Sequence, residues 1–186
     1  MGKQLGHNKF VENALKYGFS LWGLPKTGQT TSYRTGDDGD LKKGYPKEPP
    51  RFKDNGDGTI TDNATGLMWV KDPSQLGGVW GTPGNPSDMT WNNAIDNCLA
   101  LDYAGHNDWR LPNVVELMSI RRWLHSGPTW DPIYFPNSQL DYYWTATQCL
   151  EQAGYKWGVR GNDGYPGGRI YTAEDFVRPV RLGVPK

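Results

Sequence analysis

Two turn signals close together constrain the fold of this chain more than any other feature. The segments DNGDG (54–58) and DNATG (62–66) separate three short runs that contain apolar residues. Asn-Gly and Asp-Gly between such runs are typical of tight β-hairpin turns, because these residues accept positive φ at little cost. We therefore predict an antiparallel meander with strands at 51–53, 59–61 and 67–70.

Residues 71–88 are rich in Gly and Pro and should form a long loop, and a first helix is predicted after them. Thr90 is a suitable N-cap residue, and apolar side chains follow it at the spacing of one helical stripe. That stripe, which we expect to be buried, consists of Trp91, Ala94, Ile95, Cys98 and Leu99.

A second helix is predicted from the segment DWRLPNVVEL (108–117). Asn113 and Glu116 have the spacing of a capping box, so the helix should run from Val114 to about Leu124, before Gly127 and Pro128.

Arg110 is held at the corner between this helix and the extended residues before it, because Pro112 disfavours a helical conformation at Leu111. One hypothesis gives Arg110 a role in catalysis or ligand binding. We favour a structural role, in which the guanidinium ties together loop carbonyls and a nearby carboxylate such as Asp108. The five donors of arginine suit that role.

The C-terminal third of the chain predicts four more strands, at 142–147, 155–160, 169–172 and 176–181. Pro179 makes the last one an edge strand or a bulged strand, since proline cannot donate to the ladder. With 24 Gly, 14 Pro, 9 Trp and 10 Tyr in the chain, we expect many turns fixed by large aromatic side chains. The predicted class is therefore α+β, with an N-terminal arm at 1–50 packed against one domain at 51–186.

Charge and hydropathy argue against two classes of partner. The 20 basic and 20 acidic residues cancel, and no basic run of five appears, so nucleic acid is not expected. No stretch approaches the ~18 consecutive apolar residues of a membrane span, and no apolar signal segment is visible. The compartment is left open, and the cell surface or the extracellular space remains an option.

The metal-binding residue types are scattered, so neither a metal nor another cofactor is expected. GDDGD (36–40) contains enough oxygen for a calcium hypothesis, but it is short, and we favour a solvated acidic turn. Cys98 and Cys149 form either one disulfide or two buried thiols.

Five segments between residues 51 and 182 carry a family resemblance. In order they are FKDNGDGTITDNATGLMW, TWNNAIDNCLAL, DWRLPNVVEL, YYWTAT and FVRPVR. Together they resemble the C-terminal domain family of bacterial collagen-like adhesins. The resemblance implies a C-type-lectin-like fold, in which two helices pack on a twisted antiparallel sheet and long loops cover one face.

The related formylglycine-generating enzymes place a similar Arg-Leu-Pro corner in their scaffold and act through a pair of reactive cysteines. Cys98 lies on a predicted helix and Cys149 has no cysteine beside it, so this chemistry does not carry over. No nucleophile has a base beside it in the sequence, and we expect no enzyme. An oxidase of the formylglycine-generating type is kept as an alternative.

A narrower resemblance is to proteins diversified by retroelements, which often use this fold and vary near the C-terminus. Residues 141–176 hold five of the ten tyrosines, among Asn, Asp, Arg and Gly, a composition typical of variable binding surfaces. Glycine-rich hairpins with structural tyrosines are the alternative explanation. Tyr143, Trp144 and Trp157 fall in the framework pattern of the family.

The predicted function is the non-catalytic recognition of a protein or another macromolecule by a monomer or small homo-oligomer. Its binding residues should be exposed on one face, above Arg110, Trp144 and Trp157, and they are Tyr142, Gln148, Leu150, Tyr155, Lys156, Arg160, Asn162, Asp163, Tyr165, Arg169 and Tyr171. An alternative is an adhesin for sulfated glycans, which would need an oligomer to align Lys42, Lys43, Arg121 and Arg122.

Overall fold

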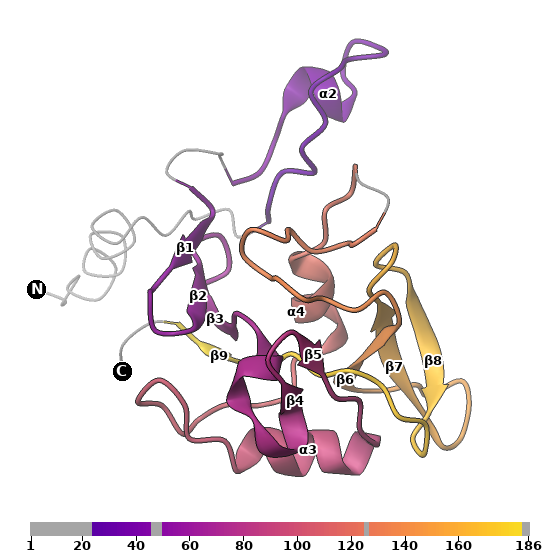
Figure 1. The fold of residues 1–186 in the computed structure, drawn as a ribbon. Helices are drawn as coiled ribbons and strands as arrows, with labels where there is room; N and C mark the ends of the chain where they lie inside the picture. Colours follow the sequence, from indigo (N-terminus) through magenta and orange to yellow (C-terminus); the bar gives the residue numbers. More distant parts are fainter. Residues whose placement is uncertain (1–23, 46–49, 125–126, 184–186) are drawn as a thin grey trace, which may run out of the picture.

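Two antiparallel sheets and two helices form the body of the protein in a computed structural model that describes residues 24–45, 50–124 and 127–183 (Figure 1). One sheet has the strand order β1-β2-β3-β9 and the other has the order β6-β7-β8. The α+β class is therefore confirmed, with the strands divided between two main sheets. Residues 1–23 and 46–49 of the predicted arm lie outside the described residues.

The predicted meander forms three strands of the first sheet. They are β1 (Phe52–Asp54), β2 (Thr59–Asp62) and β3 (Leu67–Val70), paired antiparallel in this order. Carboxylates organise the first turn, since Asp54 Oδ1 accepts from the N–H of Gly56 at 3.0 Å and Asp57 Oδ1 accepts from the N–H of Thr59 at 3.0 Å. Gly56 has φ 79°, the positive value for which glycine was expected in this turn.

The last strand joins the meander. Strand β9 (Val180–Leu182) is shorter than predicted and pairs antiparallel with β3 at the sheet edge. The residues before it do not form a strand, because Phe176 makes an isolated bridge with Tyr143 of the other sheet. The segment from Phe176 to Val180 thus connects the two sheets (Figure 1).

The second sheet consists of β6 (Tyr142–Gln148), β7 (Tyr155–Arg160) and β8 (Pro166–Ile170). Strand β8 starts three residues earlier than predicted, because Pro166 opens an edge strand, where a missing N–H is tolerated. A register shift interrupts the β6–β7 ladder between Trp144 and Gln148.

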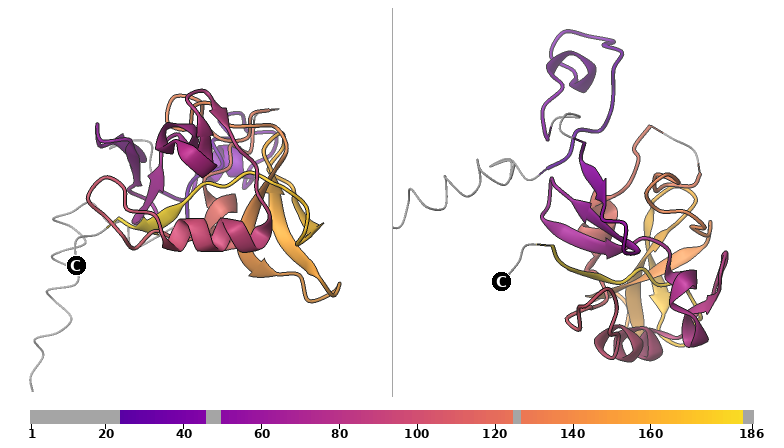
Figure 2. Two further views of the ribbon diagram at one scale, coloured as in Figure 1. Left: turned by 60° about the horizontal axis from the view of Figure 1, so that its bottom comes forward. Right: turned by 60° about the vertical axis from the view of Figure 1, so that its left-hand side comes forward.

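Short elements fill the long loop before the first helix. They are two 3-10 helices, η1 (Pro73–Leu76) and η2 (Gly78–Trp80), and a small hairpin of β4 (Gly81–Thr82) and β5 (Asn85–Pro86). A further short helix, α2 (Asp38–Leu41), lies in segment 24–45, which projects from one end of the body (Figure 2).

Helix α3 (Trp91–Leu99) begins after Thr90, as predicted. Ala94 and Cys98 are buried, and Trp91 and Ile95 are half-buried. The prediction was wrong for Leu99, which is 63% exposed. Eight residues advance about 80° beyond two full turns, which carries Leu99 away from the buried stripe.

Helix α4 (Val114–Ser119) has the predicted capping box. Asn113 Oδ1 accepts from the N–H of Glu116 at 2.9 Å, and Glu116 Oε2 accepts from the N–H of Asn113 at 2.8 Å. The helix ends before the predicted Leu124, because the chain turns so that the N–H of Arg122 bonds the carbonyl of Thr129 at 2.7 Å.

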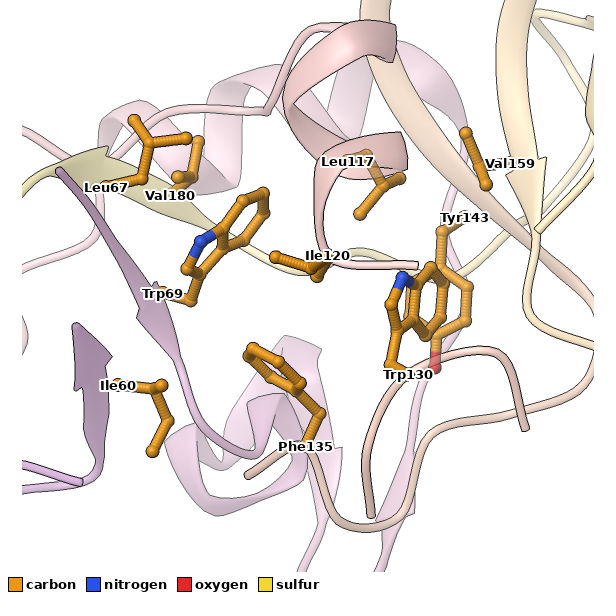
Figure 3. Close-up of a cluster of buried hydrophobic side chains, with 10 residues drawn as sticks. All are labelled: Ile60, Leu67, Trp69, Leu117, Ile120, Trp130, Phe135, Tyr143, Val159 and Val180. Carbon is orange, nitrogen blue, oxygen red and sulfur yellow. The ribbon is translucent and has the colours of Figure 1, made fainter. Parts of the chain in front are cut away.

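The main core lies around α4, between the two sheets (Figure 3). Figure 3 shows Trp69 of β3 on one side of Leu117 and Ile120, and Tyr143 of β6 with Val159 of β7 on the other. A second buried cluster around α3 includes Trp80, Met89, Cys98, Leu111 and Trp144. Trp69, Trp109 and Trp144 are buried, while Trp91 and Trp157 are half-buried.

Arg110 takes the structural position favoured for it, but with a different acidic partner. Its guanidinium pairs with both carboxylate oxygens of Glu116, at 2.7 Å and 2.6 Å, whereas Asp108 pairs with Arg181. Glu116 therefore both caps α4 and fixes the corner before it.

Glu116→Ala should lower the free energy of unfolding by about 1–2 kcal/mol at pH 7, because it removes a cap and the partner of Arg110. Burial favours a higher pKa for Glu116, but hydrogen bonds from Arg110 and Asn113 outweigh it and hold the pKa below its ordinary 4.5. Glu116 thus stabilises fully above that value, and its contribution is lost as the pH falls through the lowered pKa.

The measurement is urea denaturation of both proteins from pH 7 to pH 3. The difference should shrink with acid, and a constant difference would contradict this assignment. The control Val115→Ala, on the exposed side of α4, should change stability by less than ~0.5 kcal/mol.

Candidate functional site

One side of the β6-β7-β8 sheet carries a row of aromatic and basic side chains. Tyr142 is paired with Arg160, and Lys156 with Arg169. Directly paired residues point to the same side of a sheet, so each pair contributes to one surface. The Arg169 guanidinium lies 4.6 Å from the centroid of the Tyr142 ring, and the Arg160 guanidinium lies 6.0 Å from it.

Helix α3 extends this row. Lys156 Nζ lies 4.4 Å from the centroid of the Trp91 ring and 3.4 Å from Gln148 Oε1. The Trp91 indole N–H donates to the carbonyl of Thr145 in β6 at 2.9 Å, which fixes the ring against the sheet. We define the aromatic-basic face as Trp91, Tyr142, Lys156, Arg160 and Arg169.

Two glycines make room for the central ring of this face. A Cβ at Gly158 would lie 3.2 Å from Tyr142 Cδ1 and 3.1 Å from Arg169 Cγ, and a Cβ at Gly167 would lie 2.9 Å from Tyr142 Oη. Gly158 and Gly167 are themselves paired across β7 and β8. The Tyr142 ring can therefore lie close to the sheet only because these two positions have no side chain.

Two acidic residues hold the guanidinium groups of the face. Asp175 accepts from Arg169 Nε at 2.9 Å and from Arg169 Nη2 at 2.7 Å, and Asp163 forms a similar pair with Arg160. Burial raises the pKa of Asp175, whose side chain is only 1% exposed. The Arg160–Asp163 pair is far more exposed, and it should contribute little to stability.

The structure exposes only part of the predicted binding set. Gln148, Leu150, Asn162, Tyr165 and Tyr171 are exposed. The others are half-buried, and they are Tyr142, Tyr155, Lys156, Arg160, Asp163 and Arg169. All of these except Tyr155 take part in ion pairs or cation–π contacts. The expectation of full exposure is corrected for these six.

The predicted residues do not all share one face. Tyr155 alternates with Lys156 along β7 and so points to the other side of the sheet, where its ring lies near Gly168. Leu150 lies in the β6–β7 loop, whereas Asn162 and Tyr165 lie in the β7–β8 loop. A six-residue strand separates these loops by about 17 Å. The structure brings together Tyr142, Gln148, Lys156, Arg160, Asp163 and Arg169.

Trp91 is the member of the face that sequence analysis assigned to the core. Its place in the apolar stripe of α3 gave no signal of partial exposure. Trp144, expected beneath the face, is buried, and its indole N–H donates to the carbonyl of Met89 at 2.7 Å.

The described part of the chain holds no group of three or more His, Cys, Asp or Glu residues that could bind a metal ion. In the GDDGD segment, Asp37 caps α2 and accepts from the N–H groups of Tyr33 at 2.7 Å and Asp40 at 2.9 Å. The segment thus acts as a capped turn.

Cys98 and Cys149 are free thiols, and both are buried. Burial raises the pKa of the Cys98 thiol, which disfavours the reactive thiolate. No helix within residues 24–45, 50–124 and 127–183 is long and apolar enough to cross a membrane.

A cleft of about 530 Å³ lies between segment 24–45 and residues 120–131. Lys42, Arg121 and Arg122 line it, so one chain brings together three of the four basic residues of the glycan hypothesis. Lys43 is exposed and is not part of the lining.

A family model described as the Lcl C-terminal domain matches residues 58–181. The matched region contains both helices of the body and the whole aromatic-basic face, and it begins after segment 24–45. None of the curated proteins compared with the chain matches it.

Proposed function

Because the chain belongs to the Lcl C-terminal domain family, we propose that it is a non-catalytic domain that binds a protein or another macromolecule through the aromatic-basic face. Membership of this family agrees with the resemblance to the C-terminal domains of collagen-like adhesins. The observation that carries the proposal is the position of Tyr142, which lies over Gly158 and Gly167 beside two guanidinium groups.

This arrangement lowers the cost of binding. Side chains already held by ion pairs and stacking lose less conformational entropy when a ligand arrives. Tyr, Trp and Arg are also the residue types that most often dominate the energy of protein interfaces. The face is spread over three strands and the start of α3, which suits a large ligand better than a small one.

We also propose that the body has a C-type-lectin-like fold. Two helices pack against antiparallel strands, and the last strand, β9, returns to pair with β3 near the start of the domain. The absence of catalysis belongs to the same proposal. The burial of both thiols, and the raised pKa of Cys98, support it against the oxidase alternative.

Diversification by a retroelement is the finer part of the proposal. It predicts a near-copy of the last coding segment in the neighbouring DNA, differing mainly at adenines. The altered codons should include those of Tyr142, Lys156, Arg160 and Arg169, because these residues share one surface.

Sequencing the DNA on both sides of the gene tests this prediction. Codons of buried framework residues such as Trp144 and Val159 serve as the internal control and should be unchanged. If no copy exists, or if the differences fall equally on buried codons, the domain is an adhesin of fixed specificity.

A further inference from the structure

The cleft between segment 24–45 and residues 120–131 combines apolar walls with basic side chains. Phe52, Ile120, Trp123 and Leu124 supply apolar surface, and the Arg121 guanidinium lies 4.1 Å from the centroid of the Trp123 ring. At about 530 Å³, the cleft falls within the range of small-molecule sites in proteins, ~300–1,000 Å³.

The cleft is lined by more basic side chains without an ion-pair partner among the described residues than by acidic side chains. Lys26, Lys42, Arg121 and Arg122 line it, and none of the four forms a salt bridge with a described residue. The lining includes two carboxylates with partners of their own. Asp38 accepts from the Thr27 hydroxyl, and Asp131 accepts from the N–H of Ile133 at 3.0 Å.

Two buried donors in the lining lack partners. Tyr45 Oη and Arg121 Nε have no hydrogen-bond partner within the part of the chain that the structure describes. Buried polar groups in native proteins are nearly always bonded, so such atoms call for an explanation. Both atoms are covered by neighbouring protein atoms, so they lie behind the wall of the cleft and do not themselves face a ligand there.

We propose that this cleft binds a compact amphipathic anion, a small molecule in which a carboxylate or phosphate is attached to an aromatic or aliphatic body. The cations would bind the oxyanion, and the apolar walls would cover the body of the ligand. A sulfated polysaccharide carries many charges and little apolar surface, so it fits these walls poorly. The site is separate from the aromatic-basic face, and its occupancy does not depend on the ligand of that face.

The test uses three small probes with the intact chain: 3-phenylpropionate, its neutral analogue 3-phenylpropanol, and acetate. NMR detects binding at the indole N–H of Trp123, assigned by its loss in Trp123→Phe. The expected result is a saturable shift with 3-phenylpropionate at millimolar concentrations, and an affinity at least about tenfold weaker for each of the other probes, since each lacks one half of the recognition.

Two variants and a matched control locate the site. Lys42→Gln and Arg122→Gln should each weaken 3-phenylpropionate binding about three- to tenfold, the value of a charge-assisted hydrogen bond in a partly exposed site. Lys43→Gln, next to Lys42 but outside the lining, should leave it unchanged. Thermal unfolding checks that each variant is folded. The comparison of the three probes uses the unaltered protein, so it remains informative even if a variant fails to fold.

Several results would overturn the inference. Equal binding of 3-phenylpropanol would show an apolar site without charge recognition, and equal binding of acetate would show a simple anion site. A heparin oligosaccharide that shifts Trp123 when 3-phenylpropionate does not would assign the cleft to sulfated glycans. The absence of any shift at Trp123 would rule out a small-molecule site there.

Discussion

Trp69→Ala is expected to lower the free energy of unfolding by about 3–5 kcal/mol, the usual cost of deleting a buried tryptophan. Trp69 is fully buried in β3, opposite Ile60 of β2 and close to Val180 of β9. Figure 3 shows its ring directed towards Leu117 and Ile120, so its removal leaves a void between the four-stranded sheet and α4.

Urea denaturation monitored by circular dichroism measures this cost. Trp123→Ala is the matched control, because Trp123 is 47% exposed and should contribute less than about 1.5 kcal/mol. Similar losses for the two variants would mean that Trp69 does not occupy the centre of the core.

Signals that act over a few residues predicted the local structure well. The DNGDG turn and the Asn113–Glu116 capping box depend on hydrogen bonds between neighbours, and both are present. The strand at β7 was predicted with its bounds because its side chains alternate on a half-buried strand.

Features that depend on distant contacts were not predictable in this way. The end of α4 is decided by a hydrogen bond from Arg122 to Thr129, and the partner of Arg110 is Glu116 although Asp108 is closer in sequence. The division of the strands into two sheets depends on the pairing of β9 with β3, which no local pattern indicates.

The candidate site shows the same limit. The composition of the C-terminal segment pointed to its tyrosine, lysine and arginine residues as candidates. Tyr142, Lys156, Arg160 and Arg169 of this segment form the aromatic-basic face together with Trp91. The composition of a segment does not show how its strands pair. The strand register places Lys156 on this face and directs Tyr155 to the other side of the sheet. Trp91 reaches the face only because α3 starts beside β6, an arrangement of the tertiary fold.

The structure separates the residues that stabilise the domain from those proposed to bind. Tyr143 and Val159 are buried, whereas Tyr142 and Arg160 lie on the outer side of the same two strands. Substitutions at Lys156 and Arg160 should therefore change ligand affinity at little cost in stability, whereas a substitution at Arg169 would leave the buried Asp175 carboxylate without its partner.

The double variant Tyr142→Ala/Arg160→Ala should consequently lose about a hundredfold in affinity, since each truncation of an interface anchor costs more than ~1 kcal/mol and some cost over 2. Its free energy of unfolding should fall by less than about 2 kcal/mol, because the Arg160–Asp163 pair is exposed and the Tyr142 ring is only half-buried. The matched control is Tyr33→Ala/Lys53→Ala, a Tyr and a basic residue that are exposed away from the face.

An array of purified proteins and glycans first identifies a ligand that the unaltered protein binds. Surface plasmon resonance then measures the affinity of the unaltered protein, the Tyr142/Arg160 variant and the control variant for that ligand. This comparison tests the role of the aromatic-basic face most directly. The expected result is weak binding by the folded Tyr142/Arg160 variant and unchanged binding by the control. A folded Tyr142/Arg160 variant that binds as tightly as the unaltered protein would contradict the proposed function.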